Sequence, residues 1–236
     1  MQVCVISATR MVEADFWQRS ALGNSLRRLA CDVRIGARIA FANTAGLPAV
    51  YNAEMAEAPS EVALVFMHDD VWIDDHFFCD HVLAGLRQFD VLGVAGNLRR
   101  VAGQPAWAFA DSTLTWGDAA LLSGSIAGGR QPFGVVTRYG DTSQECELLD
   151  GVLLAARSET LRRTGLSFDP RFAFHFYDMD FCRAARSLGL KLGTWPIAVT
   201  HQSGGRFGTS PWREAFRLYA AKWEAGDGHP AQVSGG

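Results

Sequence analysis

Three adjacent side chains that can bind a metal or exchange protons, His68, Asp69 and Asp70, directly follow the apolar run 62–67. Such a run predicts a buried strand, and in open α/β sheets ligands bind beyond the carboxyl ends of the strands. Neighbouring carboxylates repel each other unless a cation lies between them. The segment therefore predicts a hard divalent metal that carries a phosphate-containing substrate.

The direction of each side chain depends on how far the strand continues. If it remains extended to residue 70, His68 and Asp70 face one side and Asp69 the other. The metal would then bind Asp70 and His68, and Asp69 would contact a ribose or sugar hydroxyl. The alternative is a solvated acidic turn that caps a helix beginning near Asp74, because aspartate is common at such positions.

A second acidic group lies in the segment 168–183, FDPRFAFHFYDMDFCR. Asp178 and Asp180 fall at the start of an expected helix, where free amides and the helix dipole stabilise carboxylates. Simple capping would also explain them. The residues just upstream are largely aromatic: Phe172, Phe174, His175, Phe176 and Tyr177. These rings can hold a sugar ring or pack in the core, and both interpretations stay open.

Two further positions carry chemistry. His201 follows an expected strand and precedes a glycine-rich turn, so it is placed to be a ligand, although a lone histidine is commonly structural. Its imidazole would favour manganese over magnesium. Asp150 and Gly151 interrupt the apolar run 147–156. Asp150 can contact donor sugar or acceptor, whereas the Asp-Gly pair can also mark only a bulge.

The elements that must position these residues alternate over the first half of the chain. Strands are expected at 3–8, 33–41, 62–67 and 91–95, and helices at 12–30, 49–58 and 74–89. This order predicts parallel strands joined by right-handed crossovers. Further on, 97–145 is rich in Gly, Ser, Thr and Trp and predicts hairpins and substrate loops. Strands at 147–156 and 191–199 and helices at 158–165, 177–189 and 212–223 follow, and 226–236 is expected to be a disordered tail.

The amino-acid composition excludes some classes of protein. The chain has 236 residues, 48% of them hydrophobic, and 22 basic against 25 acidic residues. This balance argues against a nucleic-acid binder that relies on phosphate neutralisation. The five scattered cysteines indicate a reducing compartment. No apolar run approaches the roughly 20 residues of a membrane span, and none resembles a secretory signal. We expect a cytoplasmic protein, with peripheral contact at the inner face of a membrane as a further possibility.

Taken together, the order HDDV, LLDG, FYDMDFCRAARSLGL and HQSGG resembles glycosyltransferase family 2. The resemblance covers about residues 1–205 in element order, and it is closest to bacterial sugar transferases of capsule and surface polysaccharide. It implies a single-domain α/β GT-A fold, a Rossmann-like mixed, mostly parallel sheet flanked by helices. The domain would span 1–225, with a donor half at about 1–96 and an acceptor half at about 97–225.

The resemblance also implies roles for individual residues. Asp70 matches the last acid of the metal-binding DXD motif, His201 a histidine that completes the metal site, and Asp178 the catalytic base. Asn52 matches an asparagine of the donor-side helix. The other expected donor or substrate contacts are Asp69, Asp150, Gly151, Tyr177 and Asp180. Two residues depart from the family pattern, since His68 replaces the first acid of DXD and Tyr177 replaces a glutamate beside the base.

The implied reaction is transfer of a sugar, with inversion, from a nucleoside diphosphate sugar to an acceptor hydroxyl. A UDP-sugar is the favoured donor, a glycan or lipid-linked molecule the acceptor, and Mn²⁺ or Mg²⁺ the cofactor. We expect Asp178 to act with an ordinary carboxyl pKa of about 4. A sugar nucleotidyltransferase is less consistent, because 7–11 holds no glycine for a phosphate-gripping loop. A degenerate transferase that only binds nucleotide sugar or glycan is the alternative from another class.

Overall fold

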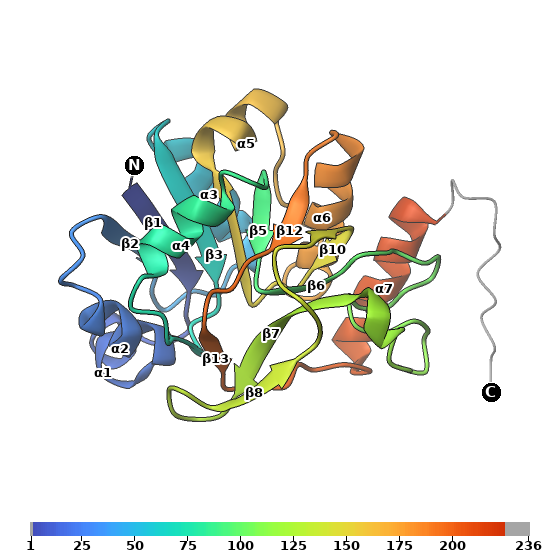
Figure 1. Cartoon of the computed structure of the whole chain (residues 1–236), viewed down its shortest axis with the longest axis horizontal. Coiled ribbons are helices and arrows are strands. Elements are labelled where there is room, and N and C mark those ends of the chain that lie inside the picture. The colour runs from blue at the N-terminus through green and yellow to red at the C-terminus, as the bar shows by residue number, and fades with distance from the viewer. Residues whose placement is uncertain (1, 225–236) are drawn as a thin grey trace.

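The computed structural model, which describes residues 2–224, is a mixed α/β fold with two sheets and flanking helices (Figure 1). The larger sheet has seven strands, in the order β2 (Ile35–Ala40), β1 (Gln2–Ala8), β3 (Val62–Met67), β11 (Leu153–Arg157), β5 (Val91–Gly93), β12 (Leu192–Thr194) and β9 (Glu145–Cys146). Pairing directions show that β2, β1, β3, β5 and β12 run one way, and β11 and β9 the other. The expected mixed, mostly parallel sheet is therefore confirmed.

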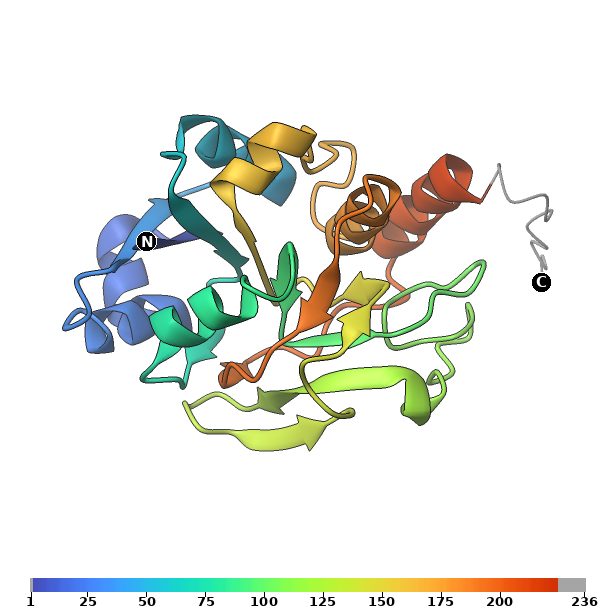
Figure 2. The same cartoon turned by 45° about the horizontal axis from the view of Figure 1, so that its top comes forward.

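The smaller sheet has the order β10 (Leu148–Leu149), β6 (Ala95–Asn97), β7 (Leu122–Gly128), β13 (Val199–His201) and β4 (Val71–Ile73), and β8 (Val135–Arg138) pairs with β7. The helices are α1 (Glu13–Arg19), α2 (Ala21–Arg28), α3 (Leu47–Glu57), α4 (Phe78–Gly85), α5 (Ser158–Thr164), α6 (Tyr177–Ser187), α7 (Ser210–Trp223) and the short η1 (Ala119–Leu121). Figure 2 shows the β7–β8 hairpin along one side of the molecule, with α7 at the end opposite α1 and α2.

The core is centred on β3, all six residues of which are buried. This strand is apolar throughout because it lies between β1 and β11, with Val65 opposite Val5 on one side and Ala155 on the other. A strand buried on both faces lacks the alternation of a half-exposed one. The carboxyl end of β3 is therefore held by neighbouring strands on both sides, and residues 68–70 follow it directly.

Several expected elements are divided in the structure. The expected helix 12–30 is two helices, because Ser20 ends α1 and caps α2 by accepting the amide hydrogen of Gly23 at 2.8 Å. The expected helix 74–89 is shorter, and α4 begins at Phe78. The strand β4, at residues 71–73, was not predicted.

Three expected strands share one error, because each crosses from the larger sheet to the smaller one. The run 91–95 becomes β5 and β6, the run 147–156 becomes β10 and β11, and the run 191–199 becomes β12 and β13. Asp150 and Gly151 lie at the second of these crossings. Residues 68–70 also connect the two sheets, from β3 to β4, so His68, Asp70 and Asp150 all lie at such connections.

The five cysteine side chains differ in burial. Cys79, Cys146 and Cys182 are buried, whereas Cys31 is exposed, and all five cysteines are free. Across residues 2–224, none of the helices combines the length and apolarity needed to cross a membrane.

Candidate functional site

His68, Asp70 and His201 converge beyond the carboxyl end of β3. Asp70 Oδ1 lies 3.3 Å from His201 Nε2 and 4.0 Å from His68 Nδ1. One ligand atom from each residue lies within 4.8 Å of the other two, so the three could hold one metal ion. The pairing of β13 with β4 places His201 opposite Val71, which brings it beside Asp70. The fold thus unites the three residues expected to bind the metal.

The charge of Asp70 is well suited to a cation. Its Oδ1 atom is buried and accepts no hydrogen bond of good geometry from the described residues. Burial acts to raise the Asp70 pKa, but the attraction of His201 outweighs it and lowers that pKa to about 2. Asp70 in turn raises the pKa of His201 against the effect of burial. An unsatisfied carboxylate oxygen between two imidazoles fits a divalent metal that accepts nitrogen and oxygen ligands.

Tyr177 fixes the protonation of His68. The Tyr177 hydroxyl donates to the Gly151 carbonyl at 2.7 Å and lies 2.9 Å from His68 Nε2. Because its single proton is used on Gly151, the hydroxyl must accept from Nε2–H of His68. Burial lowers the His68 pKa and favours the neutral ring. The lone pair of that ring then lies on Nδ1, near Asp70, where it is free to bind a metal. The Tyr177 hydroxyl, by binding the other ring nitrogen, would hold the imidazole in that orientation.

This geometry predicts that Tyr177→Phe weakens Mn²⁺ binding by about 10-fold to 100-fold, because His68 loses the acceptor that fixes its tautomer. The free Mn²⁺ signal in electron paramagnetic resonance measures the affinity. Tyr219→Phe, which changes a buried tyrosine of α7, is the matched control and should bind Mn²⁺ as the unmodified protein does. Equal affinities in all three proteins would contradict this role of Tyr177.

Asp178 occupies the first turn of α6 and is half-buried. Its carboxylate accepts the amide hydrogens of Gly151 at 3.0 Å and of Met179 at 2.9 Å. Burial, with repulsion from Asp150 as the next cause, raises the Asp178 pKa to about 7. The expectation of an ordinary pKa was wrong. The Asp178 carboxyl is more strongly desolvated than it would be at an open helix start, and the fold brings the negative charge of Asp150 near it.

Asp150 and Gly151 form the crossing between β10 and β11. Asp150 accepts from the Val152 amide at 2.7 Å and from Trp107 Nε1 at 2.5 Å. A Cβ atom on Gly151 would lie 2.5 Å from Tyr177 Oη and 2.9 Å from Asp178 Cβ, so only glycine fits here. The pair is therefore a backbone bend, and the same bend holds Tyr177 and Asp178 in position.

Asp69 interacts with Thr9, which directly follows β1, rather than with His201. Burial raises the Asp69 pKa, and Thr9 acts against that rise. The strand β3 ends at Met67, so the alternation expected for residues 68–70 stays a prediction. Helix capping does not explain these acids, because Asp75 is the residue that accepts the Phe77 amide hydrogen before α4, at 2.8 Å.

Two predicted donor contacts are not brought to this cluster. The Asn52 side chain donates to the Phe168 carbonyl at 2.7 Å and accepts from the Phe168 amide at 2.9 Å. Asp180 is 1% exposed and binds Trp223 Nε1 and Lys222 Nζ, both at 2.7 Å. Asn52 thus joins α3 to the segment before α6, and Asp180 joins α6 to α7. Their donor contacts stay predictions.

Sequence reasoning missed two residues at the site. Thr9 interacts with Asp69, and Ser203 Oγ lies 3.0 Å from His201 Nε2. Thr9 could have been found from its place directly after the first strand, at the same sheet edge as Asp69, whereas Ser203 carried no comparable signal. Of the aromatic residues upstream of α6, Phe174 stacks on His68, with ring centroids 5.8 Å apart and ring planes 23° apart.

Comparison with known proteins gives similar structures but no sequence relative. No family model matches the chain, and no curated protein does. A Drosophila β-1,4-galactosyltransferase 7 mutant in complex with manganese, UDP-Gal and xylobiose is similar over 92% of this chain and 80% of its own, with TM-score 0.47 and 9% identity. The mannosyltransferase PcManGT from Pyrobaculum calidifontis, in complex with GDP-Man and Mn²⁺, is similar over 90% of this chain and 59% of its own, with TM-score 0.46 and 15% identity. At these values the likenesses assign neither activity nor ligand to this chain.

Proposed function

We propose that this protein is an inverting, metal-dependent glycosyltransferase that moves a sugar from a nucleoside diphosphate sugar to an acceptor hydroxyl. One observation carries the proposal. A chain of hydrogen bonds from His68 through Tyr177 and Gly151 to Asp178 joins a metal-type ligand set to a carboxylate of raised pKa. A reaction with an anionic leaving group and a protonated nucleophile needs both parts in one site.

The motif order supports a more specific assignment. We infer a GT-A enzyme similar to glycosyltransferase family 2 that acts in bacterial capsule or surface polysaccharide synthesis, with a UDP-sugar as the favoured donor. The donor half would be about 1–96 and the acceptor half about 97–225, in one domain. Asp70, His201 and His68 would hold Mn²⁺ or Mg²⁺, and the two imidazoles favour Mn²⁺. We place the enzyme in the cytoplasm, at the inner face of the membrane when its acceptor is lipid-linked.

The mechanism divides between the two parts of the site. A bound divalent cation would neutralise, as a Lewis acid, the negative charge that grows on the diphosphate leaving group. Asp69, near Thr9 at the end of β1, would accept a hydrogen bond from a hydroxyl group of the donor. Asp178 would take the acceptor proton while the new bond forms on the face opposite the leaving group. With a pKa of about 7, Asp178 is a stronger base than an ordinary carboxylate.

The raised pKa predicts a pH dependence. Only the ionised form of Asp178 accepts a proton, so kcat/KM for the acceptor should rise with pH and level off above about 7. Asp150→Asn removes a negative neighbour that raises this pKa, so its profile should shift to lower pH. Initial rates between pH 5 and 9 measure both profiles. A flat profile, or an unshifted midpoint in Asp150→Asn, would contradict the assignment of Asp178 as the base.

A donor panel tests the function as a whole. Thermal unfolding is measured with UDP-, GDP- and dTDP-sugars, each with and without Mn²⁺. Stabilisation grows with ligand concentration over the dissociation constant, so a true donor should raise the Tm only when Mn²⁺ is present. Release of the nucleoside diphosphate on addition of acceptor then separates an enzyme from a binding module. A panel without any metal-dependent shift would overturn the proposal.

A further inference from the structure

A row of aromatic rings leads from the predicted active site to the surface. Trp107 donates to Asp150, and its ring packs edge-on against Tyr139 with centroids 4.9 Å apart. The Tyr139 ring stacks on the Trp116 ring, with centroids 6.1 Å apart and an angle of 24° between the ring planes. Phe109 packs against Trp116 at 5.3 Å and against Phe207 at 5.1 Å. We call the outer rings Phe109, Trp116, Tyr139 and Phe207 the aromatic platform.

The platform is more exposed than the ring that joins it to Asp150. Trp107 is 6% exposed, whereas Trp116 is 57% exposed and Phe207 is 40% exposed. Contiguous exposed aromatic side chains are unusual on a soluble surface and mark a binding site. Here the inner end of the row touches Asp150, whose charge acts on the predicted base Asp178. The platform is therefore connected, through buried Trp107, to Asp150 beside the predicted base.

The backbone holds these rings in place without a ligand. Phe109 and Trp116 are opposite each other in a short antiparallel bridge, and the Gly117 amide donates to the Ala108 carbonyl at 2.8 Å. The Tyr139 amide donates to the Gly124 carbonyl at 2.9 Å, which fixes Tyr139 to β7. A surface that is ordered in advance costs less entropy on binding.

We propose that the aromatic platform is the acceptor subsite and that it binds a neutral oligosaccharide; this rests on the proposed glycosyltransferase function. The C–H groups on one face of a sugar ring carry partial positive charge and are attracted to the electron-rich face of an aromatic ring. The hydroxyl groups at the edge of the sugar ring stay in water or meet polar groups such as Thr115. The charges beside the platform are of both signs, with Asp111 two residues from Phe109, and Arg138 and Arg206 next to Tyr139 and Phe207 in sequence. The platform therefore lacks the positive charge of a single sign that a phosphorylated acceptor would favour.

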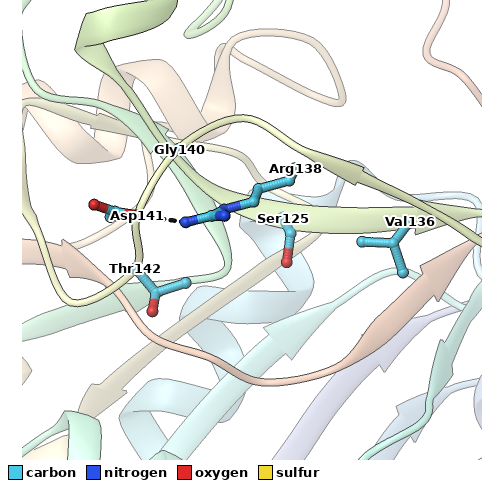
Figure 3. A pocket seen from close by; sticks show the side chains of 6 residues that line it. All are labelled: Ser125, Val136, Arg138, Gly140, Asp141 and Thr142. Carbon is cyan, nitrogen blue, oxygen red and sulfur yellow. Dashed lines mark hydrogen bonds and ion pairs between the residues drawn. The ribbon is translucent and has the colours of Figure 1, made fainter.

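A hollow on the β7–β8 hairpin is separate from the platform and supplies a control. Figure 3 shows it between β8 and the loop that follows, where Arg138 pairs with Asp141 beside Ser125 and Thr142. Arg138 and Tyr139 are consecutive in an extended segment, so their side chains face opposite sides. Arg138→Ala therefore changes the hairpin without changing the platform.

Calorimetric titration tests the subsite without donor or metal, using cellotetraose, chitotetraose and α-1,6-mannotetraose as probes. We expect the unmodified protein to bind at least one of them, and Trp116→Ala and Tyr139→Ala each to weaken that binding about tenfold, which is the loss of one ring contact. Trp116→Phe should restore part of it. Arg138→Ala and Phe77→Ala, which removes an exposed ring of another segment, should bind as the unmodified protein does.

Three outcomes of the titration would overturn this inference. They are failure of every probe to bind, binding by Trp116→Ala equal to that of the unmodified protein, and a loss in Arg138→Ala equal to that in Trp116→Ala. Binding to phosphatidylglycerol vesicles that Trp116→Ala abolishes would also overturn it, by showing a lipid surface. The Mn²⁺-dependent donor panel is independent of the platform. If a nucleotide sugar raises the Tm in the presence of Mn²⁺ but no oligosaccharide binds, the proposed function stands and only the assignment of this subsite is wrong.

Discussion

Asp178→Asn should lower the rate of sugar transfer by about 10²-fold to 10⁴-fold, the range of a general base, while donor and Mn²⁺ affinities stay unchanged. The asparagine oxygen can still accept the Gly151 amide hydrogen that Asp178 accepts at 3.0 Å, so the bend at residues 150–152 is kept. The side chain can no longer take a proton. Nucleoside diphosphate release measures transfer, and calorimetry measures donor binding.

Stability provides an internal check on this variant. The folded-state pKa of Asp178 is raised above the value of about 4 that a carboxyl has in the unfolded chain. The folded protein therefore loses stability as pH rises from about 4 to about 7, when the carboxyl ionises. Asp178→Asn should melt no lower than the unmodified protein at pH 8. Asp15→Asn, an exposed change on α1, is the activity control. Unchanged turnover in Asp178→Asn would remove this residue from the mechanism.

Asp70→Asn should lower the affinity for Mn²⁺ at least about 100-fold and abolish transfer. The charge that it removes lies 3.3 Å from His201 Nε2 and 4.0 Å from His68 Nδ1, at the centre of the ligand set. An amide oxygen is a weaker ligand than a carboxylate for a divalent ion, and it leaves two imidazoles without an anionic partner. Electron paramagnetic resonance of Mn²⁺ reports the affinity directly.

Asp69→Asn is the matched control for Asp70→Asn. The two residues are adjacent and chemically identical, but Asp69 interacts with Thr9, whereas Asp70 pairs with His201. We expect Asp69→Asn to bind Mn²⁺ normally and to weaken only donor binding. Loss of Mn²⁺ in both variants, or in neither, would contradict the division of residues 68–70 into a metal side and a donor side.

The strand 62–67 and the places of His68 and Asp70 at its end could be predicted because they depend on local pattern. His201 was recognised as a possible ligand from its place after a strand, but its approach to Asp70 depends on the pairing of β13 with the unpredicted strand β4. A strand buried on both faces is apolar throughout, and the polar residues that end it lie at the sheet edge. The same pattern could not show that three strands divide between two sheets. Periodicity reports burial, and the residues on both sides of each crossing are buried.

The electrostatics of the site depend on contacts that no local pattern contains. The pKa of Asp178 depends on burial and on Asp150, which reaches it through the bend at Gly151. Tyr177 was expected to contact substrate, and the structure shows it between His68 and Gly151. The sequence shows that Tyr177 stands where the family pattern has a glutamate, but it does not show that the tyrosine contacts His68 and Gly151.

The pairing of β6 with β10 also bears on how such a protein can change its specificity. Asn97 and Leu148 are direct partners, so the two ends of the segment between them lie side by side. This segment includes β7, which pairs with β13 at His201 and therefore supports the predicted metal site. The connection from β6 to β7 carries Trp107 and Trp116 and contains no strand of either sheet. Insertions in that connection would change the proposed acceptor subsite and leave the strands that hold the predicted metal ligands in place.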